Sequence, residues 1–290
     1  MHENPTLILV GGPTASGKSA FALELAQKRD GIIINADAMQ IYAGLPVLTA
    51  QPDASARAAV PHLLYEILDA AQNGSAGKWL VLAQAAIAGV RGMGKTPIIV
   101  GGTGMYFAAL LGGLADIPAI PEKTRLAAEK LYDEMGEEKF RREVAKKDSE
   151  SAARIARNDR QRLIRAYAVA AHTGKSLSAW QKAGAARDPD AGYEKHLLLP
   201  PREELYAACD KRFALMMKSG AVEEVKALLT RKLSPSLPAM KILGLREIAA
   251  WLNGEITREE AMAKAQQMTR NYAKRQMTWF RNQWKIREAG

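Results

Sequence analysis

The sequence of 290 residues predicts an α/β fold in which helices flank a parallel sheet and a basic, all-helical domain is inserted. Short apolar runs at 7–10, 31–34 and 97–100 alternate with helix-like segments, a pattern typical of buried parallel strands. Between the first run and the first helix, residues 12–19 match the phosphate-loop motif G-x-x-x-x-G-K-S/T. Strand signals stop after residues 117–121. Together these observations predict a P-loop NTPase-like sheet with a helical insertion.

The elements of the sheet domain follow in the order strand, turn, helix. The first strand leads into a helix expected over 18–28, which should bury Phe21, Leu23, Leu25 and Ala26. The second strand, 31–37, ends on the carboxylate of Asp37, and the strand 97–100 is followed by a glycine-rich segment at 101–104. Right-handed crossovers between parallel strands place a ligand site beyond the carboxyl ends of those strands.

Composition divides the chain into a core and an insertion. Residues 1–116 and 193–290 are expected to form the P-loop catalytic core, and residues 117–192 an inserted domain, because 122–182 is rich in strong helix formers. A strand-like run at 195–199 continues the sheet, and the chain that follows is helical. In the last helix an apolar stripe is predicted to be core: Ala273, Met277, Phe280 and Trp284.

Overall composition excludes several classes of protein. Hydrophobic residues make up 48% and charged residues 25% of the chain, which excludes a disordered or collagen-like protein. The single cysteine, Cys209, excludes an intrachain disulfide and a zinc site built from several cysteines. The longest apolar stretch, 107–115, is shorter than the roughly 18 residues that span a membrane, and residues 1–5 lack signal-peptide features. We expect no membrane segment, a cytoplasmic location and a monomer.

The net charge of +10 is unevenly distributed. Residues 1–116 hold 7 basic and 8 acidic side chains, whereas residues 139–187 hold 13 and 4. This asymmetry favours a polyanionic partner, most often a nucleic acid, although solubility alone also accounts for a moderate excess. Side chains at three- or four-residue spacing are predicted to form one helical face that is either solvated or in contact with phosphates: Arg154, Arg157, Gln161 and Arg165.

The phosphate loop and Asp37 are the candidate chemical groups. Backbone amides of the loop and the following helix N-terminus favour an anion, Lys18 adds a point charge, and the Ser19 hydroxyl is predicted to hold Mg²⁺. The motif does not decide between hydrolysis of a nucleotide, phosphoryl transfer and displacement of a whole diphosphate. Asp37 is expected near the loop, where it either ligates the metal, acts as a general base or caps a turn.

Five segments of the chain resemble one family. They are Gly-Pro-Thr-Ala-Ser-Gly-Lys-Ser at 12–19, Asp-Ala-Met-Gln-Ile-Tyr at 37–42, Pro-His at 61–62, Gly-Gly-Thr-Gly-Met-Tyr at 101–106 and Thr-Arg-Asn-Tyr-Ala-Lys-Arg-Gln-Met-Thr-Trp-Phe-Arg at 269–281. This set is similar to the tRNA dimethylallyltransferases, also called tRNA isopentenyltransferases, over nearly the whole chain. The chain departs from the family at Ala38, usually a serine, and at Gln51, usually a lysine.

The resemblance implies transfer of a dimethylallyl group from dimethylallyl diphosphate to the exocyclic amine of the adenine just 3′ of the anticodon in tRNA, with release of diphosphate. The catalytic residues that it implies are Asp37, as the base, with Thr14 and Arg212 at the diphosphate. Without the resemblance, Arg212 would be interpreted as a solvated helix residue.

The resemblance also implies two sets of binding residues and a role for the insertion, 117–192, in binding the tRNA anticodon stem-loop. The implied diphosphate-binding residues are Gly12, Pro13, Thr14, Ala15, Ser16, Gly17, Lys18 and Ser19. The implied tRNA-binding residues are Asp37, Ala38, Met39, Gln40, Thr103, Arg125, Gln161, Arg162, Leu163, Ile164 and Arg165.

Three other functions remain open on the residues alone. A P-loop small-molecule kinase would use ATP and an acceptor hydroxyl activated by Asp37. A prenyltransferase acting on free adenine nucleotides would share the core chemistry, and a nucleotide-gated nucleic-acid-binding module would have no chemistry at all. The large basic insertion favours tRNA over the first two, and the lack of a second Asp at a strand end disfavours the third.

Overall fold

The computed structural model describes residues 6–115, 117–183 and 192–284, and its fold confirms the predicted α/β class. In the described residues one parallel sheet has the strand order β3-β2-β4-β1-β5. Its strands are β1 (Leu7–Gly11), β2 (Gly31–Asn35), β3 (His62–Leu63), β4 (Thr96–Gly101) and β5 (Tyr193–Leu197). Strands β1, β2 and β4 are buried almost throughout, which explains why they are continuous apolar runs in the sequence.

Several predicted strand limits differ from the structure, most of all in the second strand and in the last, which ends at Leu197 rather than residue 199. The second strand ends at Asn35, because the Asn35 amide accepts a hydrogen bond from the Asp37 N–H and donates one to the Asp37 carbonyl, which turns the chain out of the sheet. The last strand begins at Tyr193 rather than Lys195, because it pairs with β1 along its whole length, from Leu7 onward. Asp37 therefore lies in a loop just beyond the sheet edge.

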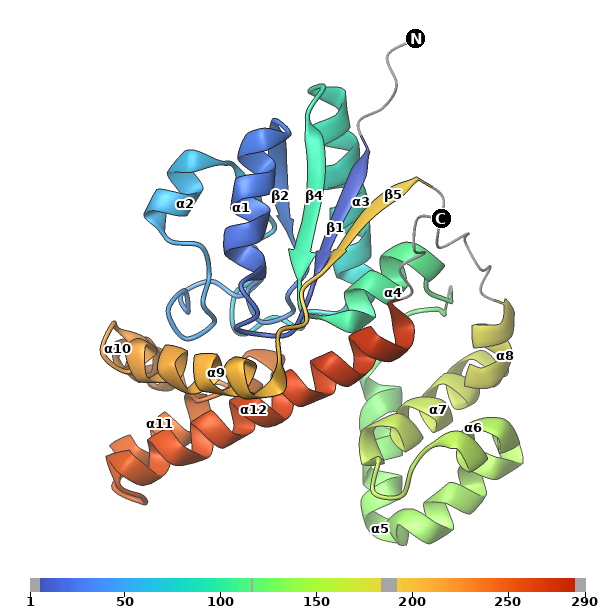
Figure 1. The fold of residues 1–290 in the computed structure, drawn as a ribbon. Coiled ribbons are helices and arrows are strands. Elements are labelled where there is room, and N and C mark those ends of the chain that lie inside the picture. The colour runs from blue at the N-terminus through green and yellow to red at the C-terminus, as the bar shows by residue number, and fades with distance from the viewer. Residues whose placement is uncertain (1–5, 116, 184–191, 285–290) are drawn as a thin grey trace. The chain divides into compact units, whose positions relative to one another are not determined.

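Helices cover both faces of the sheet: α1 (Lys18–Lys28) lies in front and α3 (Ala76–Gly92) behind, while α2 (Ala54–Ala59) and α4 (Gly104–Gly112) complete this part of the fold (Figure 1). In α1 the fully buried side chains are Ala22 and Ala26, one turn apart, so that the helix approaches the sheet closely. The prediction that α1 buries its larger apolar side chains was wrong for three of them. These side chains lie beside the two alanines and are only partly buried: Phe21, Leu23 and Leu25.

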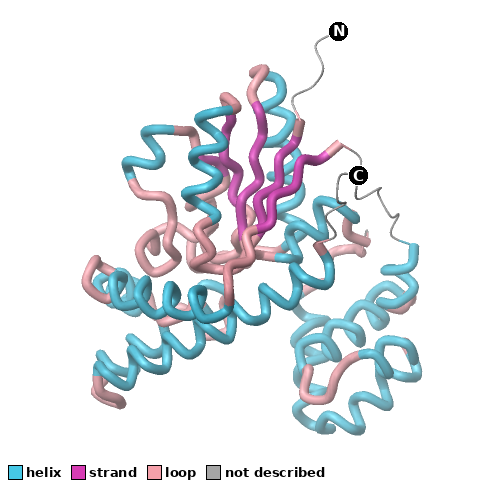
Figure 2. Tube along the Cα trace, in the orientation of Figure 1, coloured by secondary structure: helices cyan, strands magenta, loops and turns pink. Residues whose placement is uncertain are grey.

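The C-terminal third forms a helical layer across the carboxyl ends of the strands (Figure 1). It comprises α9 (Arg202–Met216), α10 (Ala221–Thr230), the 3-10 turn η1 (Pro238–Lys241), α11 (Leu245–Leu252) and α12 (Arg258–Gln283). Loops gather between the strand ends and α9 and α12 (Figure 2). The predicted stripe of the last helix is confirmed as core, because each of its four residues is at most 5% exposed: Ala273, Met277, Phe280 and Trp284.

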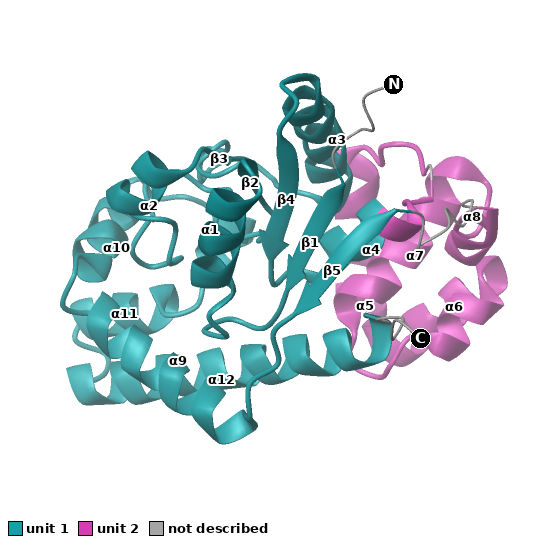
Figure 3. Ribbon diagram, turned by 45° about the horizontal axis from the view of Figure 1, so that its top comes forward, with its two compact units in different colours: residues 1–110, 190–290 teal, residues 111–189 magenta. Residues whose placement is uncertain are grey.

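The chain divides into two compact units (Figure 3): unit 1 is residues 1–110 and 190–290, and unit 2 is residues 111–189. These limits lie a few residues before those expected at 116/117 and 192/193. Residues 1–5, 116 and 184–191, on which parts of the sequence predictions fall, lie outside the described residues. Within the part of the chain that the structure describes, no helix is long and apolar enough to span a membrane.

Unit 2 is all-helical in its described part, with α5 (Glu122–Lys147), α6 (Ser149–Arg154), α7 (Arg160–Thr173) and α8 (Leu177–Ala183) around one apolar core. The predicted single face from Arg154 to Arg165 was wrong, because α6 ends at Arg154 and α7 begins at Arg160. The Arg141 guanidinium donates to the carbonyls of Ala152, Ile155 and Ala156, so that a side chain from α5 satisfies the carbonyls left at the end of α6.

Candidate active site

The phosphate loop presents hydrogen-bond donors that the protein itself does not use. Gly17 has a φ of +85°, a conformation that favours glycine, and the N-terminus of α1 behind it has no side-chain cap. In the described part of the chain the Ser16 hydroxyl is buried without a hydrogen-bond partner. Uncapped helix N–H groups and an unpaired hydroxyl fit a bound anion, because an anion accepts hydrogen bonds from both.

Lys18 adds a cation beside these donors, and its Nζ donates to the carbonyl oxygen of Pro13 at 3.1 Å. Burial lowers the pKa of Lys18 to about 8, while the nearby Asp37 carboxylate opposes that shift and Arg212 adds to it. The charges of Lys18, Asp37 and Arg212 are therefore close enough to interact electrostatically. Ser19, the predicted metal ligand, is exposed in the first turn of α1.

Thr14 is fixed by α9, which carries two residues that contact it. Arg212 Nη2 donates to Thr14 Oγ1 at 2.5 Å, and Cys209 Sγ lies 3.9 Å from the Thr14 carbonyl oxygen. Burial lowers the pKa of the Arg212 guanidinium, and the nearby Asp37 carboxylate opposes this shift. Arg212 is therefore not a solvated helix residue but contacts the phosphate loop, and its implied role at the diphosphate stays a prediction.

Asp37 is held in a defined position at the edge of the sheet. Its N–H donates to Asn35 Oδ1 at 2.8 Å, and its own carboxylate oxygen Oδ1 accepts the Met39 N–H at 2.9 Å. Asn35 is fully buried and also donates to the Leu64 carbonyl, so that the turn bearing Asp37 is tied to the neighbouring segment. A carboxylate held in this way keeps one orientation, which suits an acid–base role.

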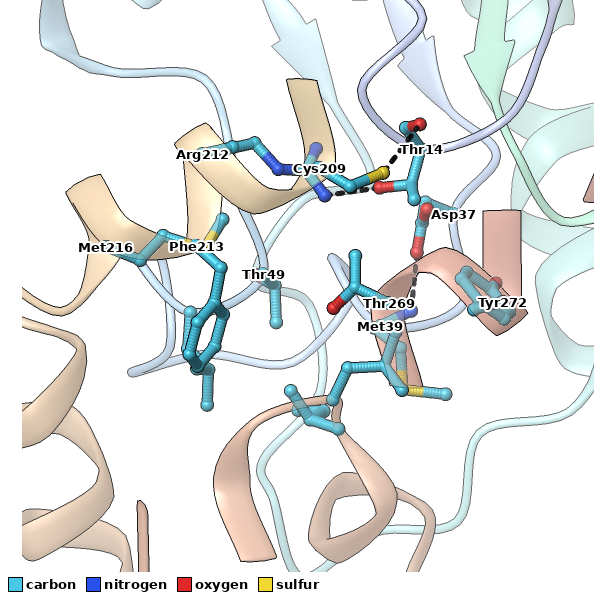
Figure 4. Close-up of a pocket in the computed structure, with 13 residues that line it drawn as sticks. Thr14, Asp37, Met39, Thr49, Cys209, Arg212, Phe213, Met216, Thr269 and Tyr272 are labelled. Atoms are coloured by element: carbon cyan, nitrogen blue, oxygen red, sulfur yellow. Dashed lines mark hydrogen bonds between the residues drawn. The ribbon is translucent and has the colours of Figure 1, made fainter. Parts of the chain in front are cut away.

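One pocket in unit 1 brings the predicted catalytic residues together (Figure 4). Thr14, Arg212 and Asp37 lie at its polar end, whereas much of the remaining wall is apolar. The pocket is lined by Thr14, Asp37, Met39, Leu48, Thr49, Cys209, Arg212, Phe213, Met216, Ile242, Leu243, Thr269 and Tyr272. The arrangement offers an anion site, a carboxylate base and a small apolar surface within one space.

Sequence reasoning missed several residues of this pocket. On α9, Cys209, Arg212, Phe213 and Met216 recur at helical spacing and share the face that lines the pocket, so that helical periodicity around Arg212 was the signal that would have found them. Tyr272 lies near Asp37, and burial followed by the Asp37 charge raises its pKa. No short motif marks Thr49 or Ile242, because loops far apart in sequence bring them to the pocket.

The predicted tRNA-binding residues of unit 1 make internal contacts around Asp37. The Ala38 N–H donates to Thr103 Oγ1 at 2.9 Å, so that the backbone of residue 38 is fixed although its side chain has no hydroxyl. Gln40 Nε2 donates to the carbonyls of Thr49 and Ala50. These bonds shape the rim of the pocket.

In unit 2, the predicted tRNA-binding run on α7 splits into two groups. Gln161, Arg162 and Arg165 are exposed, whereas Leu163 is 0% and Ile164 4% exposed in the core of unit 2. Leu163 and Ile164 are therefore corrected from contact residues to core residues, since the period of the helix turns them inward. Arg125 lies on α5, where it forms ion pairs with Glu122 and Glu129.

Comparisons with known proteins place the chain in one family. A family model described as IPP transferase matches residues 40–283, and one described as isopentenyl transferase matches residues 5–59. The tRNA dimethylallyltransferase of Caulobacter sp. (strain K31) is 52% identical over 277 residues, which cover 96% of this chain and 90% of that protein. The protein of the same name from Rhodospirillum centenum is 49% identical over 284 residues, 98% of this chain and 90% of that protein.

Solved structures give the same result. The full-length tRNA isopentenylpyrophosphate transferase of Bacillus halodurans superposes with a TM-score of 0.67 and 31% identity, covering 97% of this chain and 88% of that one. A eukaryotic dimethylallyltransferase, described as acting on tRNA, superposes with a TM-score of 0.81 and 27% identity over 95% of this chain and 70% of that one.

Proposed function

The chain belongs to the tRNA dimethylallyltransferase family, and we propose that it transfers a dimethylallyl group from dimethylallyl diphosphate to the exocyclic amine of the adenine 3′ of the anticodon. The observation that supports this reaction best is the pocket itself. It joins the phosphate loop, through Thr14 and Arg212, to the carboxylate of Asp37 and to an apolar wall. We further propose that the chain acts as a monomer.

The reaction replaces one bond at the allylic carbon with another. The bond from that carbon to the diphosphate oxygen breaks, and its electron pair leaves with the diphosphate, whose growing charge is neutralised by Lys18, Arg212 and the loop amides. The adenine nitrogen forms the new bond and loses a proton, which Asp37 accepts. The apolar wall around Phe213 and Met216 excludes water, which would otherwise compete for the allylic carbon.

Mg²⁺ fits this site only together with the diphosphate. Within the ranges that the structure describes, no three His, Cys, Asp or Glu side chains gather into a metal site. Ser19 offers one exposed hydroxyl oxygen in the first turn of α1, and phosphate oxygens and water are the ligands that Mg²⁺ prefers in such sites. We propose that Ser19 holds Mg²⁺ against the diphosphate, where the ion would neutralise part of the leaving group's charge.

For the tRNA, we propose a contact surface on α7 of unit 2. Gln161, Arg162 and Arg165 are exposed on this helix, and the segment 139–187 carries 13 basic against 4 acidic side chains. Guanidinium groups suit phosphates because they donate hydrogen bonds in a planar fork. The same excess of positive charge is not needed by an enzyme whose substrate is a free nucleotide.

The test is mass analysis of nucleosides from unmodified tRNA incubated with enzyme, Mg²⁺ and dimethylallyl diphosphate. We expect an adenosine that is heavier by one dimethylallyl group, at the position 3′ of the anticodon. Free adenosine monophosphate serves as the competing acceptor in a parallel reaction. Prenylation of the free nucleotide with none on tRNA would contradict the proposed substrate, and no prenylation of either would contradict the reaction.

A further inference from the structure

Gln276 is a buried polar residue of α12 that the proposed reaction does not use. It is 5% exposed and belongs to the C-terminal run 269–281, whose stripe of apolar residues forms core. An amide in such surroundings must have partners for both its oxygen and its nitrogen, because an unpaired buried polar group is costly. Both partners belong to loops of the candidate active site.

The Gln276 side chain joins the phosphate loop to the turn that follows β4. Its Oε1 accepts the Thr14 N–H at 2.8 Å, and its Nε2 donates to the Gly102 carbonyl at 2.8 Å. Rotating the amide by 180° would face a donor with a donor and an acceptor with an acceptor, so that one orientation alone satisfies both bonds. The side chain thus fixes the distance between the two loops.

The turn that follows β4 is shaped to receive α12. A Cβ on Gly102 would lie 2.3 Å from Gln276 Nε2, and a Cβ on Gly104 would lie 2.2 Å from the ring of Trp279. Neither glycine has a positive φ, so close approach of the helix, rather than backbone conformation, explains why glycine stands there. The contact between Gln276 and Gly102 leaves no room for a side chain between them.

The same turn holds the segment that carries the base. The Thr103 N–H donates to the Ala36 carbonyl at 3.2 Å, and Thr103 Oγ1 accepts the Ala38 N–H at 2.9 Å. Asp37 lies between these two anchored residues. Gln276 therefore links Thr14, on the leaving-group side, to the turn that holds Asp37, on the acceptor side, through two bonds of its side-chain amide.

The geometry points to Gln276 as a positioning residue that sets Thr14, with its Arg212 contact, at the correct distance from Asp37. This inference rests on the proposed transfer reaction. Gln276 acts through Thr14 and the 101–104 turn rather than on the substrates, so its loss should slow the chemical step and leave substrate binding nearly unchanged. Misplacement of reacting groups by about 1 Å costs roughly 10²-fold in rate.

The test compares Gln276→Met with Gln266→Met, a matched control on the same helix. Gln266 donates to the Asp210 carbonyl at 3.1 Å, so that its replacement also removes one side-chain bond to backbone but leaves the phosphate loop untouched. The readouts are the single-turnover rate at saturating substrates, the dissociation constants of dimethylallyl diphosphate and tRNA, and Tm. We expect Gln276→Met to be about 10²-fold slower, with both constants within about twofold of wild type.

A second variant covers the case in which Gln276→Met does not fold. Gln276→Asn keeps the amide but is one methylene shorter, so that it cannot span both 2.8 Å contacts, and it should be slowed to a similar degree. A single-turnover rate for either folded Gln276 variant within about threefold of Gln266→Met would overturn the positioning role. If wild type itself forms no prenylated adenosine, the proposed function fails; if wild type is active and the variants match the control, only this inference fails.

Discussion

Single residues carry the chemistry of this site because the fold gives each of them a fixed environment. Thr14 has contacts at its N–H, its hydroxyl and its carbonyl, from Gln276, Arg212 and Cys209 respectively. Asp37 is held through Asn35 and through its bond to the Met39 N–H. At this scale, isosteric or nearly isosteric substitutions distinguish a chemical role from a structural one.

The first prediction concerns Asp37 as the base. Asp37→Asn keeps the shape and an oxygen that accepts the Met39 N–H, but cannot accept a proton, so turnover should fall by about 10²- to 10⁴-fold while tRNA affinity stays near normal. The control is Asp30→Asn at the opposite end of β2, where Asp30 has a φ of +44° that Asn tolerates. Turnover of Asp37→Asn within about threefold of this control would remove Asp37 from the base role.

A second prediction concerns the leaving-group side of the pocket. Arg212→Gln removes the cation that contacts Thr14, so the single-turnover rate should fall by about 10²- to 10³-fold, the cost of losing one preorganised donor to a developing negative charge. Arg202→Gln at the start of the same helix, where the guanidinium lies over the Tyr206 ring, provides the control. Equal rates in the two variants would show that Arg212 has only a structural role in α9 and does not stabilise the leaving group.

At the scale of elements, apolar patterns predicted β1, β2, β4 and the stripe of the last helix, because burial on the sheet or against α9 decides those patterns. The two-residue strand β3 carries no such pattern and was not predicted. Apolar patterns did not predict helix ends that are stabilised by a side chain from another helix. The break between α6 and α7 depends on Arg141 of α5, which donates to the carbonyls at the end of α6. Residues 155–159 contain no Gly or Pro, and the local signal for the break is the pair Asn158-Asp159, in which Asn158 has a φ of +65° and Asp159 caps α7.

Unit 2 depends on one buried carboxylate, which gives a prediction about pH. Asp148 accepts hydrogen bonds from the Ser151 N–H, the Ser178 N–H and the Ser178 hydroxyl. Burial raises its pKa, but these bonds together outweigh burial and lower the pKa to about 2 from its usual 3.8. A carboxyl whose pKa is lowered by folding contributes stability above its unfolded pKa and loses it as pH falls through its folded pKa.

Asp148→Asn should therefore destabilise unit 2 by about 2 kcal/mol near neutral pH. The difference from wild type should shrink as the pH falls from about 4 to about 2. Urea titration followed by hydrogen exchange of unit 2 amides measures it, with Asp159→Asn, an N-cap replacement that keeps its capping bond, as the control. A difference that stays constant down to pH 2 would show that the charge of Asp148 is not what stabilises unit 2.

A further prediction tests α7 as a phosphate-contacting surface. Replacing Arg162 and Arg165 with Ala should weaken tRNA binding and flatten the slope of log affinity against log salt by about 0.7 to 0.9 for each phosphate that the protein no longer neutralises. Affinity for dimethylallyl diphosphate should not change. Lys130→Ala on α5 removes one charge from another exposed position and is the control. An unchanged slope in the double variant would mean that this face is merely solvated.

At the scale of the whole molecule, the active-site pocket exists because the C-terminal helices pack on the carboxyl edge of the sheet. The phosphate loop and Asp37 were predictable because each follows a strand, and parallel strands end at the same edge. The contributions of Thr269 and Tyr272 were not, because which helices cover that edge is a matter of tertiary packing, and the helical spacing around Arg212 indicates Cys209 and Phe213 only once Arg212 is placed at the pocket. The sequence showed the glycine-rich segment at 101–104 only as a turn after a strand, whereas in the structure Gly102 and Gly104 make room for α12.

The central claim is that a loop with the sequence motif of nucleotide-binding proteins holds an allylic diphosphate here. Loop amides, Lys18 and Mg²⁺ recognise phosphates and are indifferent to what those phosphates are attached to. The pocket beside them offers an apolar wall around Phe213 and Met216, which suits a five-carbon tail. A kinase or ATPase would instead need a water or hydroxyl positioned at a γ-phosphoryl group.

The most direct measurement incubates enzyme, Mg²⁺ and unmodified tRNA with either ATP or dimethylallyl diphosphate and quantifies inorganic phosphate, diphosphate and prenylated adenosine. With the allylic substrate, diphosphate and prenylated adenosine should appear in equal amounts, and Asp37→Asn should suppress both together. With ATP, no phosphate should be released above the level of the reaction without enzyme. Steady cleavage of ATP with no consumption of the allylic substrate would contradict the claim.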